Sequence, residues 1–72
     1  MYIGKGMHII GKCVITKSKD IRPKHMGKTV CNEKNRKIGR IIDIFGSVKE
    51  PHVKILIKKK NKNILGEKLF IR

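Results

Sequence analysis

The sequence predicts an all-β protein, built as one small closed or nearly closed barrel. Its apolar residues are mostly β-branched, with 13 Ile and 4 Val but no Ala, and such side chains favour strands over helices. Seven glycines and two prolines divide the 72 residues into short segments, which is typical of strands joined by tight turns. We expect closure, because an open sheet of five or six short strands would leave unpaired edges.

The first half of the chain contains two candidate strands. Met7–Ile15 is apolar on both faces, with Gly11 as a bend or bulge inside it. Thr16–Asp20 is interpreted as an exposed turn. Pro23–Gly27 is interpreted as a loop, because proline fixes its own backbone and biases the residue before it towards extended conformations. A short strand over Lys28–Cys31 and a polar connection follow.

The second half is more regular. Ile38–Phe45 is the most apolar segment, and the unequal spacing of its polar residues predicts a bulge. Gly46–Pro51 is interpreted as a loop. Val53, Ile55 and Ile57 then alternate with Lys54, Leu56 and Lys58, a period-two pattern that predicts a strand. Lys58–Asn63 has the composition of a charged hairpin tip, and Lys68–Ile71 is the last predicted strand.

The length allows one domain, residues 1–72, with a thin core. We expect residues 1–6 to be a flexible N-terminus. No apolar run approaches the ~18 to 20 residues that cross a bilayer, and the N-terminus lacks the apolar block of a signal peptide. The expected location is therefore cytoplasmic.

The sequence offers no pattern of catalytic or metal-binding residues. The five acidic residues are scattered, and no spacing between the two cysteines and the three histidines identifies a nucleophile. Cys13 and Cys31 are far apart, whereas structural zinc ligands come in close pairs. We expect reduced, packed thiols, no enzymatic activity, no metal and no cofactor.

The charge of the chain is its most unusual property. Nineteen Lys and Arg against five Asp and Glu give a net charge of +14, which attracts polyanions. One alternative function is therefore a basic β-barrel that binds RNA directly, as some ribosomal and translation-factor domains do. Aromatic stacking platforms are scarce, however, and outward lysines also keep a small barrel soluble. The candidate RNA-proximal basic patch consists of Lys58, Lys59, Lys60 and Lys62.

Residues 38–53 read IGRIIDIFGSVKEPHV. A glycine after the first apolar residue, a Phe-Gly turn and a proline before a β-run make this string specific. It resembles the core motif of the small β-barrel subunit of the box H/ACA ribonucleoprotein, the family named for its glycine-arginine-rich tails. Weaker similarity extends over most of the chain from Gly11 onward. Ser47 stands where the family usually has proline, and His52 where it usually has an aromatic residue; the tails are absent, as in the archaeal form.

The resemblance implies a six-stranded barrel similar to those of translation and reductase-type domains. It also implies a non-catalytic subunit of a guide-RNA-directed pseudouridine synthase particle. Such a subunit binds the catalytic domain of a dyskerin-type synthase and aids substrate loading and product release in rRNA pseudouridylation. In archaeal members it does so without gripping the guide RNA directly. It further implies a monomer outside the complex, located in the cytoplasm of an archaeon or the nucleolus of a eukaryote.

The loop inside the motif is the candidate partner interface, because it puts apolar and flat surface beside the most hydrophobic strand. An ordinary turn covering the barrel mouth is the alternative interpretation. The candidate interface residues are Gly46, Ser47, Val48, Pro51 and His52.

Overall fold

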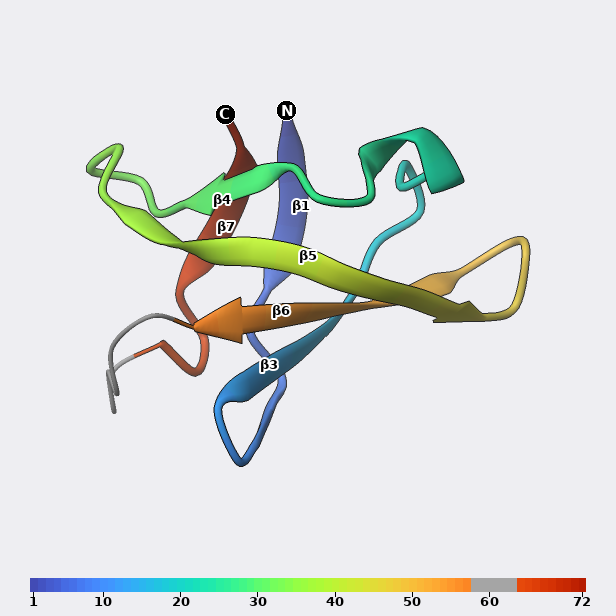
Figure 1. Ribbon diagram of the computed structural model, residues 1–72, viewed down its shortest axis with the longest axis horizontal. Helices are drawn as coiled ribbons and strands as arrows, with labels where there is room; N and C mark the ends of the chain where they lie inside the picture. The colour runs from blue at the N-terminus through green and yellow to red at the C-terminus, as the bar shows by residue number, and fades with distance from the viewer. Residues whose placement is uncertain (58–63) are drawn as a thin grey trace.

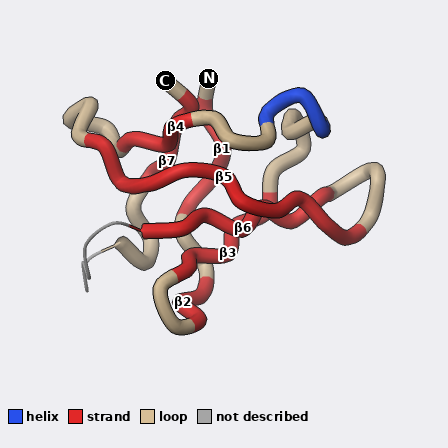
Figure 2. The backbone as a smooth tube through the Cα atoms, viewed as in Figure 1, coloured by secondary structure: helices blue, strands red, loops and turns tan. Residues whose placement is uncertain are grey.

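The structure, a computed structural model, describes residues 1–57 and 64–72, which form one antiparallel sheet that curls on itself (Figure 1). The strands are β1 (Tyr2–Lys5), β2 (His8–Ile10), β3 (Cys13–Lys17), β4 (Thr29–Cys31), β5 (Lys37–Gly46), β6 (Pro51–Ile57) and β7 (Lys68–Ile71). Their order in the sheet is β1-β7-β4-β5-β6-β3-β2. Figure 2 shows these strands joined by loops, with one short helical turn, η1 (Pro23–His25). The predicted all-β class is confirmed.

The curled sheet is a half-barrel whose open side is narrowed by contacts between β1 and β3. The Thr16 hydroxyl of β3 donates a hydrogen bond to the carbonyl oxygen of Lys5. A Cβ on Gly4 would lie 2.6 Å from the carbonyl oxygen of Lys17, so the two backbones approach too closely for a side chain there. Contacts across this seam bring the two sides of the half-barrel towards each other, and the curled sheet approaches the nearly closed barrel that the sequence predicts.

The strand count differs from the prediction for two reasons. Met7–Ile15 is not one strand but a hairpin of β2 and β3, which reverses at Gly11 with φ of 58°, a conformation that glycine adopts readily. The expected flexible N-terminus is also corrected: β1 pairs with β7, Ile3 is buried, and the ring of Tyr2 lies 5.3 Å from that of Phe70. These two differences convert five identified strands into seven.

Several other elements lie close to their predicted positions. β4 and β7 match the expected short strands, and η1 lies within the expected Pro23–Gly27 loop. The segment Thr16–Asp20 is only partly a turn, because β3 continues to Lys17 and both Thr16 and Ser18 are buried. The predicted tip Lys58–Asn63 lies outside the described residues.

The β5–β6 hairpin carries the predicted bulge. Ile41 pairs with Ile55 and Asp43 with Lys54, so Ile42 is left over between them. On the inner side of the curl these strands contribute to one apolar core. Its members are Ile3, Val14, Ile21, Val30, Ile38, Ile41, Val53, Ile55, Ile64 and Leu69.

Candidate interface at the end of the β5–β6 hairpin

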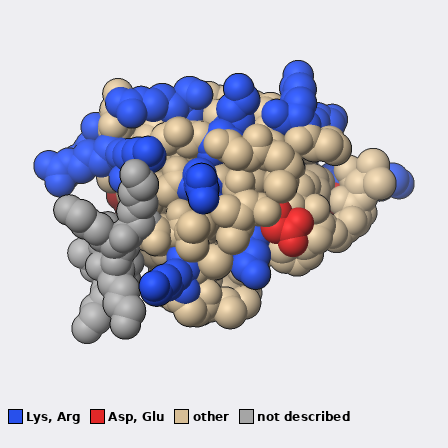
Figure 3. Space-filling model, viewed as in Figure 1, with Lys and Arg blue, Asp and Glu red and all other residues tan. Residues whose placement is uncertain are grey.

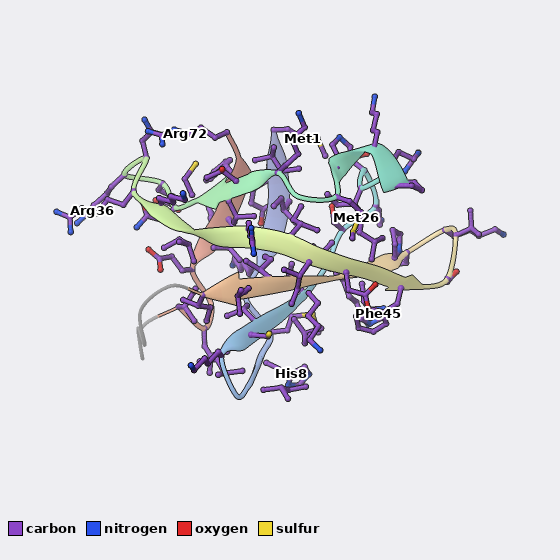
Figure 4. The ribbon with its side chains drawn as sticks, in the orientation of Figure 1. Met1, His8, Met26, Arg36, Phe45 and Arg72 are labelled. Atoms are coloured by element: carbon purple, nitrogen blue, oxygen red, sulfur yellow. The ribbon has the colours of Figure 1, made fainter. Side chains whose placement is uncertain are left out.

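Two stacked rings mark the end of the β5–β6 hairpin. Phe45 of β5 pairs with His52 of β6, and their ring centroids lie 5.5 Å apart with an interplanar angle of 18°. Phe45 is 44% exposed, and Figure 4 shows its ring at the loop end of the hairpin. Its neighbour Ile44 packs against the core instead. Side chains alternate along a strand, so at least one of these two consecutive residues is expected to point inward, and Ile44 does.

The loop that joins these strands presents one apolar side chain to solvent. Val48 is 95% exposed. The Ser47 hydroxyl accepts a hydrogen bond from the backbone N–H of Lys49 at 3.2 Å, which orders the turn. Gly46 has a φ of 96°, and a Cβ there would lie 2.8 Å from Nδ1 of His52. Glycine at this position therefore allows the backbone to turn and leaves space for the imidazole ring of His52.

The five sequence-predicted interface residues do not all face solvent. Gly46, Ser47 and Val48 are exposed, and His52 is half-buried under Phe45. Pro51 is buried, and its carbonyl oxygen accepts a hydrogen bond from the backbone N–H of Ser18 at 3.0 Å. Pro51 thus ties the loop to the end of β3 and contributes no surface of its own.

Phe45 lies on the outer side of the hairpin. For Ile44 and Phe45 the sequence favoured packing over a partner contact, because alternation sends at least one of them into the core; Ile44 packs there and Phe45 is exposed. The bulge at Ile42 changes which side chains face outward along the rest of β5. The uneven spacing of Arg40 and Asp43 was a signal of that bulge, although it did not locate the extra residue.

Positive charge gathers away from this loop. Figure 3 shows Lys and Arg along the upper edge of the view, over β4 and η1, and at the left edge, near the beginning of β5, with fewer at the loop end of the hairpin. Among the described residues, the ion pair found joins Lys68 Nζ and Glu33 Oε1 at 3.9 Å, with both side chains exposed, so it contributes little. The predicted basic patch, Lys58, Lys59, Lys60 and Lys62, lies outside the described residues.

The described residues bring together no group suited to metal binding. Over 1–57 and 64–72, no three His, Cys, Asp or Glu side chains cluster to hold an ion. Cys13 and Cys31 are buried free thiols. Within the same residues, no helix is long and apolar enough to cross a membrane.

Comparison with known proteins identifies the family. The model of the Gar1/Naf1 RNA binding region matches residues 1–72, the whole chain. The chain belongs to this family. Gar1/Naf1 proteins are non-catalytic accessory components associated with the H/ACA ribonucleoprotein, RNA binding and rRNA processing, which confirms the resemblance carried by residues 38–53.

A second similarity is to a protein of Methanocaldococcus jannaschii described as uncharacterized. The two are 48% identical over 33 residues, which cover 46% of this chain and 41% of that relative. The match therefore supports kinship over part of each protein and adds no function to that of the Gar1/Naf1 family.

Proposed function

We propose that this Gar1/Naf1 barrel is a subunit of a guide-RNA-directed pseudouridine synthase particle and binds the catalytic domain of a dyskerin-type synthase. It would bind through the hairpin-end surface, defined as Phe45, Gly46, Ser47, Val48 and His52. Family membership supports a place in the particle. The observation that carries the choice of surface is Val48, 95% exposed in an ordered turn beside a half-exposed Phe45 ring.

The energetics favour a protein partner for this surface. Burial of a valine or phenylalanine side chain contributes about 1.5 to 3 kcal/mol, and aromatic anchors often dominate interfaces. The loop is already held by the Ser18–Pro51 backbone bond and the Phe45–His52 stack. Binding therefore loses less conformational entropy than ordering a flexible loop would.

The same surface suits the proposed role in substrate loading and product release. A subunit changes a loop equilibrium in its partner only if it binds one loop position more tightly than the other. A preference of about 1.4 kcal/mol shifts such an equilibrium tenfold. A single aliphatic side chain of the barrel supplies this preference if the partner's loop buries it in one position and leaves it exposed in the other.

The test of synthase binding compares two exposed aliphatic residues. Val48→Glu should abolish co-elution with a purified dyskerin-type synthase at high salt, because a carboxylate would be desolvated in the interface. Ile10→Glu, which changes a 62% exposed residue of β2 by the same charge, should leave co-elution intact. Both variants should retain the wild-type circular dichroism spectrum, since neither side chain is part of the core. Normal synthase binding by Val48→Glu would place the interface elsewhere.

Direct RNA binding is the second candidate function, favoured by the net charge of +14. The two functions differ in salt dependence, because phosphate contacts weaken steeply with salt and apolar contacts do not. We expect the isolated protein to bind guide RNA weakly and to lose it at high salt. Tight, salt-resistant RNA binding without the synthase would make RNA binding the primary function.

A further inference from the structure

A basic cavity lies on the outer side of the sheet, towards the beginning of β5. It has a volume of about 420 Å³ and is open to solvent. Thr29, Arg40 and Leu56 form a row across three adjacent strands, because Arg40 pairs with Thr29 of β4 and with Leu56 of β6. The residues that line the cavity are Gly27, Thr29, Lys37, Gly39, Arg40 and Leu56.

The charges in this cavity are all positive. Lys37 and Arg40 are both exposed, and none of the lining residues is acidic. Asp43, the acidic residue of β5, pairs with Lys54 further along the strand, and its Oδ1 accepts a hydrogen bond from the N–H of Ile44 at 2.9 Å. Among the described residues, no carboxylate forms an ion pair with Arg40. Its guanidinium can therefore donate to an anion.

The donors are those that recognise phosphate. Arginine offers a planar fork that matches two phosphate oxygens, and lysine adds a point charge. Gly27 leaves open space where a side chain would stand, since nothing lies within 4 Å of a Cβ built on it. The lining contains no aromatic ring, so the cavity lacks the platform on which bases stack. We propose that the basic cavity binds phosphodiester groups of an RNA backbone.

The basic cavity and the hairpin-end surface lie at opposite ends of one hairpin. Arg40 and Phe45 are five residues apart on β5, which corresponds to about 16 Å at ~3.3 Å per residue. The β5–β6 ladder joins both ends, and Figure 3 shows the Lys and Arg side chains of the view mostly outside the loop end of this hairpin. A protein partner at the loop therefore leaves room for RNA at the other end, and the barrel would hold the two together.

A matched pair of substitutions at Thr29 tests the cavity. Thr29→Glu puts a carboxylate across the strand pair from Arg40, whereas Thr29→Gln has a similar size and no charge. The probes are a labelled single-stranded oligouridine and an RNA duplex, titrated between about 50 and 200 mM salt. We expect Thr29→Glu to weaken binding about tenfold or more and Thr29→Gln to bind as the wild type does. If the two variants bind both probes with equal affinity, the proposal is wrong. If Thr29→Glu weakens the binding of either probe, the proposal is supported, and the affected probe shows which RNA form supplies the phosphates.

The salt dependence separates this cavity from general attraction by the charged surface. Loss of one phosphate contact lowers the slope of log affinity against log salt by ~0.7 for a single strand. Arg40→Gln should give this reduction, while Lys24→Gln, an equal change of charge on η1, should give a clearly smaller one. Equal reductions would overturn the proposal.

The outcome does not depend on synthase binding. Thr29→Glu and Arg40→Gln should co-elute with the synthase as the wild type does, and Val48→Glu should keep its affinity for the RNA probes. If the Thr29→Glu variant loses the synthase but not RNA, the cavity is a protein contact and the proposal is wrong. Failure of Val48→Glu to disturb synthase binding would contradict the proposed function and leave the basic cavity standing.

Discussion

The replacement of Gly39 by alanine tests the packing of β5 between its neighbours. Gly39 pairs with Val30 of β4 and with Ile57 of β6. A Cβ on Gly39 would collide with the carbonyl oxygen of Leu56, and would lie 2.8 Å from the Leu56 carbonyl carbon and 3.2 Å from Cα of Ile57. All three are backbone atoms, so no side chain can rotate away. The β5–β6 ladder itself must move.

The magnitude follows from two opposed effects. Alanine restricts the unfolded chain and would stabilise a compatible site by about 0.4 to 1 kcal/mol. Overpacking, with the side-chain and backbone shifts that it forces, typically costs about 1 to 3 kcal/mol and occasionally more. Since the backbone must absorb this clash, we expect a net loss of about 3 kcal/mol or more. A domain of 72 residues has a total stability of about 4 to 11 kcal/mol at ~0.05 to 0.15 kcal/mol per residue, so the loss is a large fraction of it.

The assay is thermal and urea unfolding followed by circular dichroism. At ~4 to 8 °C per kcal/mol, Gly39→Ala should lower the Tm by about 12 °C or more. The control is Gly11→Ala. Its φ is 58° and nothing lies within 4 Å of a Cβ, so this substitution lowers the stability only by the ~1 to 2 kcal/mol that a left-handed backbone costs alanine. A Gly39→Ala variant at least as stable as Gly11→Ala would refute the reasoning.

Two further predictions concern the seam of the barrel and the thiols. Thr16→Val removes the hydrogen bond to the Lys5 carbonyl and should lower the free energy of unfolding by about 1 to 2 kcal/mol. Amide hydrogen exchange in β1 should become faster. Unchanged exchange there would mean that the bond does not hold β1 to β3. Because Cys13 and Cys31 are buried and free, a thiol reagent should modify both in concentrated urea and neither at a comparable rate in native buffer. Mass spectrometry measures this, and rapid native labelling would contradict the burial.

The sequence predicted the strands whose signal is local. The alternation in residues 53–57 and the short apolar run at Lys68–Ile71 correspond to β6 and β7, because period-two patterning follows from the pleat itself. The hairpin of β2 and β3 was missed, since apolar pairs precede and follow the Gly11–Lys12 turn and only one lysine marks the reversal. β1 was missed because its stability comes from β7, more than sixty residues away.

The candidate site was predictable in part for the same reason. Its glycine, serine and valine turn could be located from composition, and these residues are exposed. The exposure of Phe45 depends on a single extra residue in β5, and a shift of one residue sends a side chain to the other face. The burial of Pro51 depends on its bond to Ser18, which no local pattern contains.

The sequence by itself determined the all-β class, the family motif of residues 38–53 and the excess of positive charge, because each is a property of composition or of local spacing. Only the tertiary structure decided where that charge and the apolar loop lie relative to each other. Thr29, Arg40 and Leu56 come from three separate strands and meet in one row, since strand order and register, not sequence distance, set which side chains are neighbours. Two of the positive charges, those of Lys37 and Arg40, line a cavity at one end of β5, and the apolar loop lies at the other end.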